Sequence, residues 1–326
     1  MLTARSRFYL RTAASVILLG LLASKVHWSV LLTAWEHLNP MRLLAASAVA
    51  PLMIGMLALR WRVFLRQQSI AIPGRKVLGL AWAGQFFNSV LPGSTGGDIV
   101  KIYQVCRMFP EKKAAAAASV IIDRVTALIA LTVLAAGSFL YGRALPDLHL
   151  RSLPGSPAAW VAGGVAVAGL IVFGCVKLIG SPHWLARIRQ IVAALRTSFT
   201  FNRAFVLGLA NAFAVHLLNI AVFFGFARAL GISITYLQAL SFYPIILFLL
   251  LIPVTVNGHG LREALFLFYF TQLHITLKAT VGGGSLDTVF SLSLLMVAND
   301  LLWTLPGGLW YLLALGKPPK SGAGVD

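Results

Sequence analysis

Apolar runs of about 20 residues recur along the whole sequence and limit its fold more than any other feature, because a helix of that length crosses the hydrocarbon core of a bilayer. Of the 326 residues, 59% are hydrophobic and 11% are charged, whereas average soluble domains carry roughly 25% charged residues. We therefore expect an all-α, polytopic membrane protein with about six spanning helices. The expected spans are 8–24, 41–59, 114–141, 157–179, 204–228 and 286–315.

Two further apolar stretches are interrupted at Pro and Gly, and a second helical piece follows each break. The first is 77–92, followed by 97–108, and the second is 237–253, followed by 261–275. Apolar pieces of about 10 to 14 residues are too short to cross a bilayer untilted and are more often re-entrant or buried. We expect these segments to form two re-entrant helical hairpins.

The basic residues lie mainly in short loops between the apolar runs, although the formal net charge is +18. Nucleic-acid binding needs a contiguous basic face outside the bilayer, so no nucleic-acid partner is expected. Loops rich in Lys and Arg stay on the cytoplasmic side. This rule places both termini and the loops 60–76 and 177–203 at the cytoplasmic face of the inner membrane. The run 8–24 lacks a convincing A-x-A cleavage site, so we interpret it as a retained helix rather than a signal peptide.

This topology gives the two halves of the chain the same order of parts with opposite orientations. Inverted repeats with broken helices are a recurring design of secondary transporters. The turns "LPGSTGGDIVKIY" (91–103) and "IPVTVNGHGLREALFLFY" (252–269) each run from a Pro through small or polar residues and a pair of Gly to an acidic residue and an apolar helix. The expected organisation is one transmembrane domain over 1–326, with repeats at 1–145 and 155–316 and a disordered tail at 317–326.

The Gly-rich turn before Gly97 suits an anionic ligand. Non-helical backbone cannot face lipid, because each unpaired N–H or C=O costs several kcal/mol there. The helix that begins near Gly97 presents free N–H groups and a positive dipole end. Lys101 lies one turn further on, on the same face as Asp98, so a phosphate or similar head group would fit. The alternative is an ordinary turn in which Asp98 caps the helix and closes the hairpin.

Ionisable residues inside apolar segments are further candidates, because such residues usually face an interior partner. Asp123 and Arg124 are neighbours that point about 100° apart on a helix. We expect one of them to meet a hairpin and the other to snorkel or find a second partner. The candidate substrate-binding residues are Asn88, Pro92, Gly96, Gly97, Asp98, Lys101, Asp123, Arg124, Asn257, Gly258, His259, Gly260, Arg262, Glu263 and Asp300. The alternative is a buried ion-pair lattice that holds the hairpins to the long helices.

The sequence shows no catalytic constellation such as a Ser-His-Asp order or an H-E-x-x-H motif. His259 and Glu263 stand four residues apart, but a zinc site would need a third protein ligand. We therefore expect no enzymatic activity, no metal and no cofactor.

Three stretches match a known pattern: "GQFFNSVLPGSTGGDIVKIYQV" (84–105), "ASVIIDRVTALIAL" (118–131) and "LIPVTVNGHGLREALFLF" (251–268). They resemble signature stretches of the lysylphosphatidylglycerol synthase transmembrane-region family, also described as flippase-like. The order and spacing cover essentially the whole chain. The resemblance implies lipid translocation or lipid handling at the inner membrane. It assigns family positions to Asn88, Pro92, Gly96, Gly97, Asp98, Asp123, Arg124, Pro253, Gly258, Gly260, Arg262 and Glu263.

The sequence departs from the family pattern in two places. The synthases continue into a soluble aminoacyl-transferase domain, whereas this sequence stops at Asp326, so aminoacyl transfer is not expected. His259 stands where the family pattern has an apolar residue, which argues against a role for His259 alone.

The leading hypothesis is a flippase-like transporter that moves an anionic or glycosylated phospholipid, or a polyprenol- or hopanoid-type lipid, across the inner membrane. Lys101, Arg124 and Arg262 would compensate the charge of the head group near the midplane. The alternative is a non-transporting subunit that holds or regulates enzymes of lipid or cell-envelope biosynthesis. A membrane-embedded enzyme and a solute transporter are further alternatives. The expected partners are membrane lipids with anionic head groups, and the candidate protein partners are a second copy, as a homodimer, and lipid-biosynthesis enzymes.

Overall fold

The computed structural model describes residues 38–90, 96–144, 190, 192, 195, 202–251, 260–272 and 285–315. Within these ranges every regular element is a helix, which confirms the expected all-α fold. In chain order the elements are α3 (Pro40–Ser47), α4 (Val49–Gln67), α5 (Gly74–Val90), α6 (Gly96–Met108), the short 3-10 helix η1 (Pro110–Lys112), α7 (Lys113–Ala144), α10 (Arg203–Ala229), α11 (Tyr236–Leu249), α12 (Leu261–Gln272) and α13 (Ser285–Leu315).

Four helical stretches in the described residues are long and apolar enough to cross a membrane, as a multi-pass membrane protein requires. They are Pro40–Gln67, Pro110–Tyr141, Arg203–Ala229 and Asp287–Leu313, and they coincide with four of the expected spans. The other two, 8–24 and 157–179, lie outside the described residues. The two stretches expected to be broken are indeed separate helices, α5 and α6 in one case and α11 and α12 in the other.

The first long stretch extends further than the sequence suggested. The expected span ended at residue 59, and Arg60 was assigned to a cytoplasmic loop. Instead α4 continues to Gln67, because Trp61, Phe64 and Leu65 prolong its apolar stripe at helical spacing and are all buried. Arg60 is therefore a residue of the helix, and its side chain is buried.

Short polar signals mark where the helices of the second half begin and end. The Asn202 side chain accepts a hydrogen bond from the Phe205 N–H at 3.0 Å and caps α10. Gly231, with a φ of 76°, turns the chain after α10, in a left-handed conformation that glycine adopts without steric cost. Thr235 and Gln238 then form a reciprocal capping box at the start of α11.

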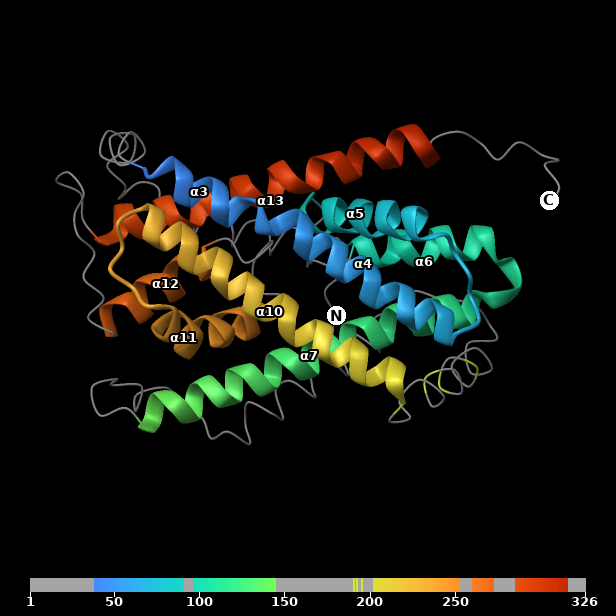
Figure 1. The fold of residues 1–326 in the computed structure, drawn as a ribbon, viewed down its shortest axis with the longest axis horizontal. Coiled ribbons are helices and arrows are strands. Elements are labelled where there is room, and N and C mark those ends of the chain that lie inside the picture. The colour runs from blue at the N-terminus through green and yellow to red at the C-terminus, as the bar shows by residue number, and fades with distance from the viewer. Residues whose placement is uncertain are drawn as a thin grey trace, which may run out of the picture.

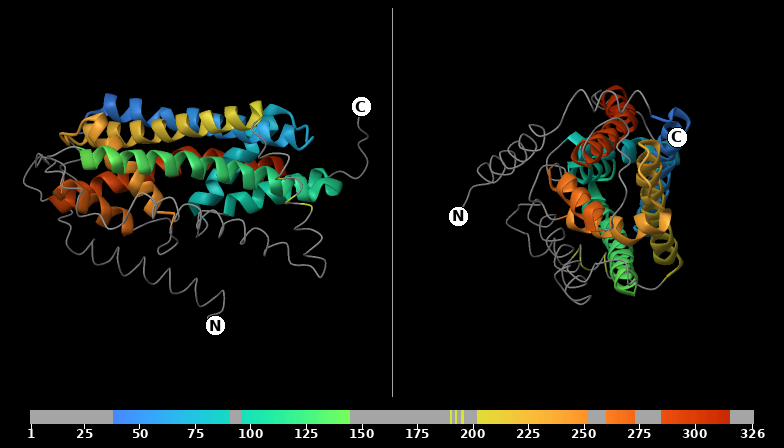
Figure 2. Two further views of the ribbon diagram at one scale, coloured as in Figure 1. Left: turned by 90° about the horizontal axis from the view of Figure 1, so that it is seen from below. Right: turned by 90° about the vertical axis from the view of Figure 1, so that its left-hand side faces the viewer.

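The two broken helix pairs lie at opposite ends of an elongated bundle. Figure 1 shows α5 and α6 toward one end and α11 and α12 toward the other, while α4, α7, α10 and α13 run along the length. The side view in Figure 2 shows the long helices extended along the same axis.

Each broken pair packs against a long helix from the opposite half of the chain. The most extensive helix–helix packing joins α5 to α13, and α11 to α7. At the first contact, the Trp82 indole N–H donates to the Trp303 carbonyl at 2.5 Å. A side-chain carbon at Gly79 would collide with the Trp310 ring, and one at Gly307 would collide with the Trp82 backbone. The lack of a side chain at Gly79 and Gly307 therefore permits the close approach of α5 and α13.

The second contact, between α11 and α7, combines a hydrogen bond with an aromatic core. The Ser138 hydroxyl on α7 donates to the Leu240 carbonyl on α11 at 2.7 Å. Phe223 from α10, Phe242 from α11 and Phe266 from α12 pack their rings together in the buried cluster beside it. This contact therefore combines close packing of aromatic rings with an interhelical hydrogen bond, the interactions that hold helices together in lipid.

Alanine at Gly307 is expected to destabilise the protein, because overpacking of a close contact costs about 1–3 kcal/mol. The matched control is Gly55→Ala on α4, where a side-chain carbon would meet nothing within 4 Å. Alanine there is expected to be neutral or to stabilise the helix by roughly 0.5–1 kcal/mol. Thermal unfolding of both purified variants in one detergent measures the difference. Equal midpoints for the two would contradict the proposed close α5–α13 packing.

Candidate functional site

The approach of α6 to α5 depends on two glycines. Gly97 lies so close to Gly84 that a side-chain carbon on Gly97 would collide with the Gly84 carbonyl. The Gly97 N–H, in the first turn of α6, donates to the Asn88 side-chain oxygen at 2.8 Å. Asn88 thus satisfies a free N–H at the helix start. The sequence suggested Asp98 as the alternative cap of this helix. The Asp98 carboxylate is left to interact with other side chains.

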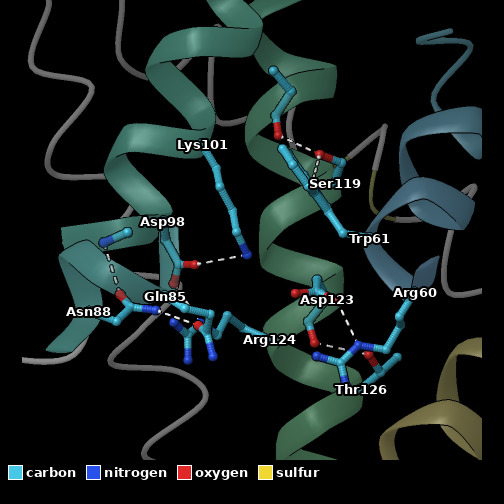
Figure 3. Close-up of polar contacts among 12 residues, drawn as sticks. Arg60, Trp61, Gln85, Asn88, Asp98, Lys101, Ser119, Asp123, Arg124 and Thr126 are labelled. Atoms are coloured by element: carbon cyan, nitrogen blue, oxygen red, sulfur yellow. Dashed lines mark hydrogen bonds and ion pairs between the residues drawn. The ribbon is translucent and has the colours of Figure 1, made fainter. Parts of the chain in front are cut away.

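Asp98 joins α6 to α7 through an ion pair. Its Oδ2 accepts from the Arg124 Nε at 2.5 Å, and the Lys101 ammonium lies 3.8 Å from its Oδ1. Figure 3 shows Lys101 extending from α6 toward this carboxylate, with Arg124 on the other side of Asp98. The expectation that Lys101 and Asp98 share one face of α6 is confirmed.

Asp123 makes a second ion pair, with Arg60 of α4. The Arg60 Nε donates to Asp123 Oδ1 at 2.7 Å, and both side chains are almost fully buried. Asp123 and Arg124 therefore point to different partners: Arg124 meets Asp98 at the start of α6, and Asp123 finds a partner on another helix. This confirms what their adjacent positions on one helix predicted.

Trp61, next to Arg60 on α4, fixes the other side of the site. Its indole N–H donates to the Ser119 hydroxyl on α7 at 3.2 Å. Its ring also lies beneath the Lys101 ammonium, with 5.1 Å between the nitrogen and the ring centroid. A cation over an aromatic face is attracted by the ring quadrupole. Figure 3 shows Lys101 and Trp61 facing each other across the space between α6 and α7.

These side chains form one buried, cation-rich group, which we call the α6 cluster. Its members are Arg60, Asp98, Lys101, Asp123 and Arg124. Its three cations outnumber its two carboxylates. A buried charge without a counter-ion is costly, so this group is suited to receive an anion or an uncharged polar group rather than a further cation. Arg124 is the most accessible member, with 31% of its side chain exposed.

A second polar group lies at the start of α12, and we call it the α12 cluster. Glu263 Oε2 accepts from the Gly260 N–H at 2.5 Å, so this carboxylate caps its own helix. The Ser293 hydroxyl on α13 donates to the other Glu263 oxygen. Arg262 Nε donates to the Ser293 hydroxyl at 3.0 Å. Glu263 is the third residue of α12, as Asp98 is of α6. Unlike Asp98, Glu263 accepts hydrogen bonds from the start of its own helix and from Ser293 on α13.

The remaining predicted site residues are placed as follows. Gly96 is buried at the start of α6. Asp300 lies on α13, and its carboxylate interacts electrostatically with Arg262 of the α12 cluster. Pro92, Asn257, Gly258 and His259 lie outside the described residues, as does Pro253.

Three contact residues were missing from the sequence prediction. Arg60 and Trp61 were placed beyond the end of the span, in a basic, helix-prone segment on the inner membrane surface, although the spacing of Trp61, Phe64 and Leu65 could have extended the span. Ser293 carries no signal in the sequence, because a serine within a spanning helix commonly bonds to its own backbone.

The comparisons with known proteins give one match. The family model described as "Lysylphosphatidylglycerol synthase TM region" matches residues 8–298. The comparisons with curated proteins and with solved structures found no match.

The Arg60–Asp123 pair is expected to contribute to stability as a unit. Removing one partner, as in Arg60→Met or Asp123→Leu, leaves a buried charge uncompensated and should cost about 3–5 kcal/mol. The double variant should cost clearly less than the sum of the two. Exposed Arg66, on the same helix, provides the control Arg66→Met, with an expected change within about 0.5 kcal/mol. Unfolding free energies that simply add in the double variant would argue against the pair.

Proposed function

Because the chain belongs to the lysylphosphatidylglycerol synthase TM region family, we propose that it is a flippase-like protein that moves lipids between the leaflets of the inner membrane. The head group would be anionic or glycosylated. The observation that carries this proposal is the α6 cluster, a buried group of charges between helices long enough to cross a bilayer. Ionisable residues in that position most often mark a pathway for a polar substrate.

The depth of the cluster supports the proposal. Arg124 lies roughly 16 Å along α7 from Lys113, at about 1.5 Å per residue. That distance is about half of the roughly 30 Å hydrocarbon core. The ion pair to Arg124 puts Asp98, and with it the start of α6, at a similar level. The broken pair of α5 and α6 would then be a hairpin that enters the membrane and returns.

The start of α6 is chemically suited to a head group. A helix N-terminus presents N–H groups and a positive dipole end to an anion. Lys101 and Arg124 add charge beside it. In the proposed role, these two side chains would compensate the charge of the head group, while Asp98 holds them in place when no lipid is bound. The acyl chains would stay in lipid.

The packing between the halves supports an inverted repeat. Helix α5 packs on α13 as α11 packs on α7, and α6 packs on α7 as α12 packs on α13. The same relations hold when each helix of the first half is exchanged for its counterpart in the second. We propose that the broken helix pair of each repeat packs against the long helix of the other repeat. The bodies that move during transport would then be α5 with α13, and α11 with α7, rather than one half of the chain against the other.

A non-transporting role is the second candidate, and the pairing within the α6 cluster favours it. Arg60–Asp123 and Arg124–Asp98 already neutralise one another, as an ion-pair lattice that only holds helices together would do. Under this alternative the protein would hold or regulate lipid-biosynthesis enzymes, and it would not need to move lipid. The two candidates differ in one measurable property, the translocation of lipid by the purified protein.

Lipid translocation is measured in proteoliposomes with a fluorescent anionic lipid and a quencher added outside. The wild type is expected to expose inner-leaflet lipid to the quencher, and Arg124→Gln to do so roughly tenfold more slowly or worse, since a contact to a charged group contributes about 1.5–3 kcal/mol. Arg107→Gln, at an exposed position near the end of the same α6 helix, should match the wild type.

Two results would count against transport. One is a wild-type rate equal to that of protein-free vesicles, and the other is equal rates for wild type, Arg124→Gln and Arg262→Ala. Unfolding midpoints of the reconstituted variants show whether a slow rate reflects loss of the fold instead.

A further inference from the structure

Within the described residues, two polar atoms of the α6 cluster make no hydrogen bond, Lys101 Nζ and Asp98 Oδ1, and they lie 3.8 Å apart. We propose that Lys101 and Asp98 together bind a hydroxyl group of the lipid head group, either of a glycerol or of a sugar. This inference rests on the proposed function, and it names the chemical feature of the head group that the site recognises.

Lys101 is the donor side of the pair. Its side chain is more than nine-tenths buried. Its ammonium group carries three N–H donors, and no acceptor among the described residues lies within hydrogen-bond distance of it. Its contacts are the Trp61 ring and, at 3.8 Å, Asp98 Oδ1. Figure 3 shows this ammonium pointing into the space between α6 and α7.

Asp98 Oδ1 is the acceptor side. The other oxygen of this carboxylate is occupied by Arg124. Oδ1 itself is buried and accepts no hydrogen bond within the described part of the chain. Buried polar atoms are nearly always hydrogen-bonded, so a buried acceptor without a hydrogen bond, beside a lysine donor, indicates a group that serves both.

The Lys101 side chain is packed on two sides. A side-chain carbon at Gly84 would lie 2.9 Å from Lys101 Cε, so the stem of Lys101 lies directly against α5. The fully buried Trp61 ring bounds its other side. The gap of 3.8 Å is within the roughly 5.5 Å that two hydrogen bonds of about 2.8 Å can bridge through one oxygen.

The chemistry of the bridging group follows from the two atoms. A phosphodiester oxygen can only accept, so beside Asp98 Oδ1 it would be repelled. An ammonium group can only donate, so beside Lys101 it would be repelled. A hydroxyl accepts from Lys101 and donates to Asp98 at the same time. The phosphate of a phospholipid would be left to Arg124, the exposed cation of the cluster.

Binding to the purified full-length protein tests this with two matched lipid pairs, each added as an equimolar mixture and read by native mass spectrometry. Phosphatidylglycerol and phosphatidylethanol have the same phosphodiester charge, but only the first has head-group hydroxyls. Monogalactosyl diacylglycerol and its sugar-permethylated analogue differ in the sugar hydroxyls. The hydroxyl-bearing member of at least one pair is expected to be retained about tenfold better, and the pair in which this happens identifies the source of the hydroxyl.

The variant Lys101→Met keeps the length of the side chain and removes its donors, so the preference should fall to about equal binding. Lys76→Met, at an exposed position on α5, should keep the wild-type preference. The comparison between lipids on the wild type needs no substitution, so it decides the question even if Lys101→Met fails to fold.

Equal retention in both pairs by the wild type would overturn the inference, and so would a preference that survives in folded Lys101→Met. A water molecule that bridges the two atoms would give the first of these results. Hydroxyl-dependent binding by a protein that does not translocate lipid would overturn the proposed function and leave this inference standing. Translocation without any hydroxyl preference would overturn this inference and leave the proposed function standing.

Discussion

The centre of this molecule depends on a carboxylate that is buried at the start of a broken helix together with the cations that neutralise it. Asp98 cannot lie in apolar surroundings without a counter-ion, because an unpaired buried charge is strongly destabilising. Arg124 supplies that counter-ion from α7, and Lys101 lies close by. The position of α6 is therefore tied to the middle of α7, and Asp123 ties the same turn of α7 to Arg60 on α4. Three helices are fixed against one another by these charges.

Glycine makes this arrangement sterically feasible. Gly84 and Gly97 bring α5 and α6 together, and Gly79 and Gly307 do the same for α5 and α13. In membranes, where apolar side chains gain little by leaving lipid for protein, close packing and interhelical hydrogen bonds are the main forces that hold helices together. The polar cluster and the Gly84–Gly97 contact share α6, so a shift of α5 against α6 would also affect Asp98 and Lys101.

The two broken pairs use an acidic residue at the same helical position for different purposes. In α12, Glu263 caps the start of its own helix and bonds to Ser293. In α6, Asn88 satisfies the Gly97 N–H, so Asp98 interacts with Arg124 and Lys101 instead. The start of α12 is therefore capped by its own carboxylate, whereas the start of α6 carries a cation-rich group in which, among the described residues, Asp98 Oδ1 accepts no hydrogen bond.

Much of this architecture can be read from the amino acids in order. Hydropathy and helical spacing depend on neighbouring residues, so the four long helices, the two breaks and the acidic residue after each break were all predictable. The divergence of Asp123 and Arg124 followed from helix geometry as well. The partners did not follow, because Arg60 and Asp123 lie 63 residues apart, and which distant side chains meet depends on how the helices pack. The same holds for Trp61 beneath Lys101 and for Ser293 beside Glu263. Interactions between residues near in sequence determine where the helices form, whereas the packing of the helices determines which side chains contact one another.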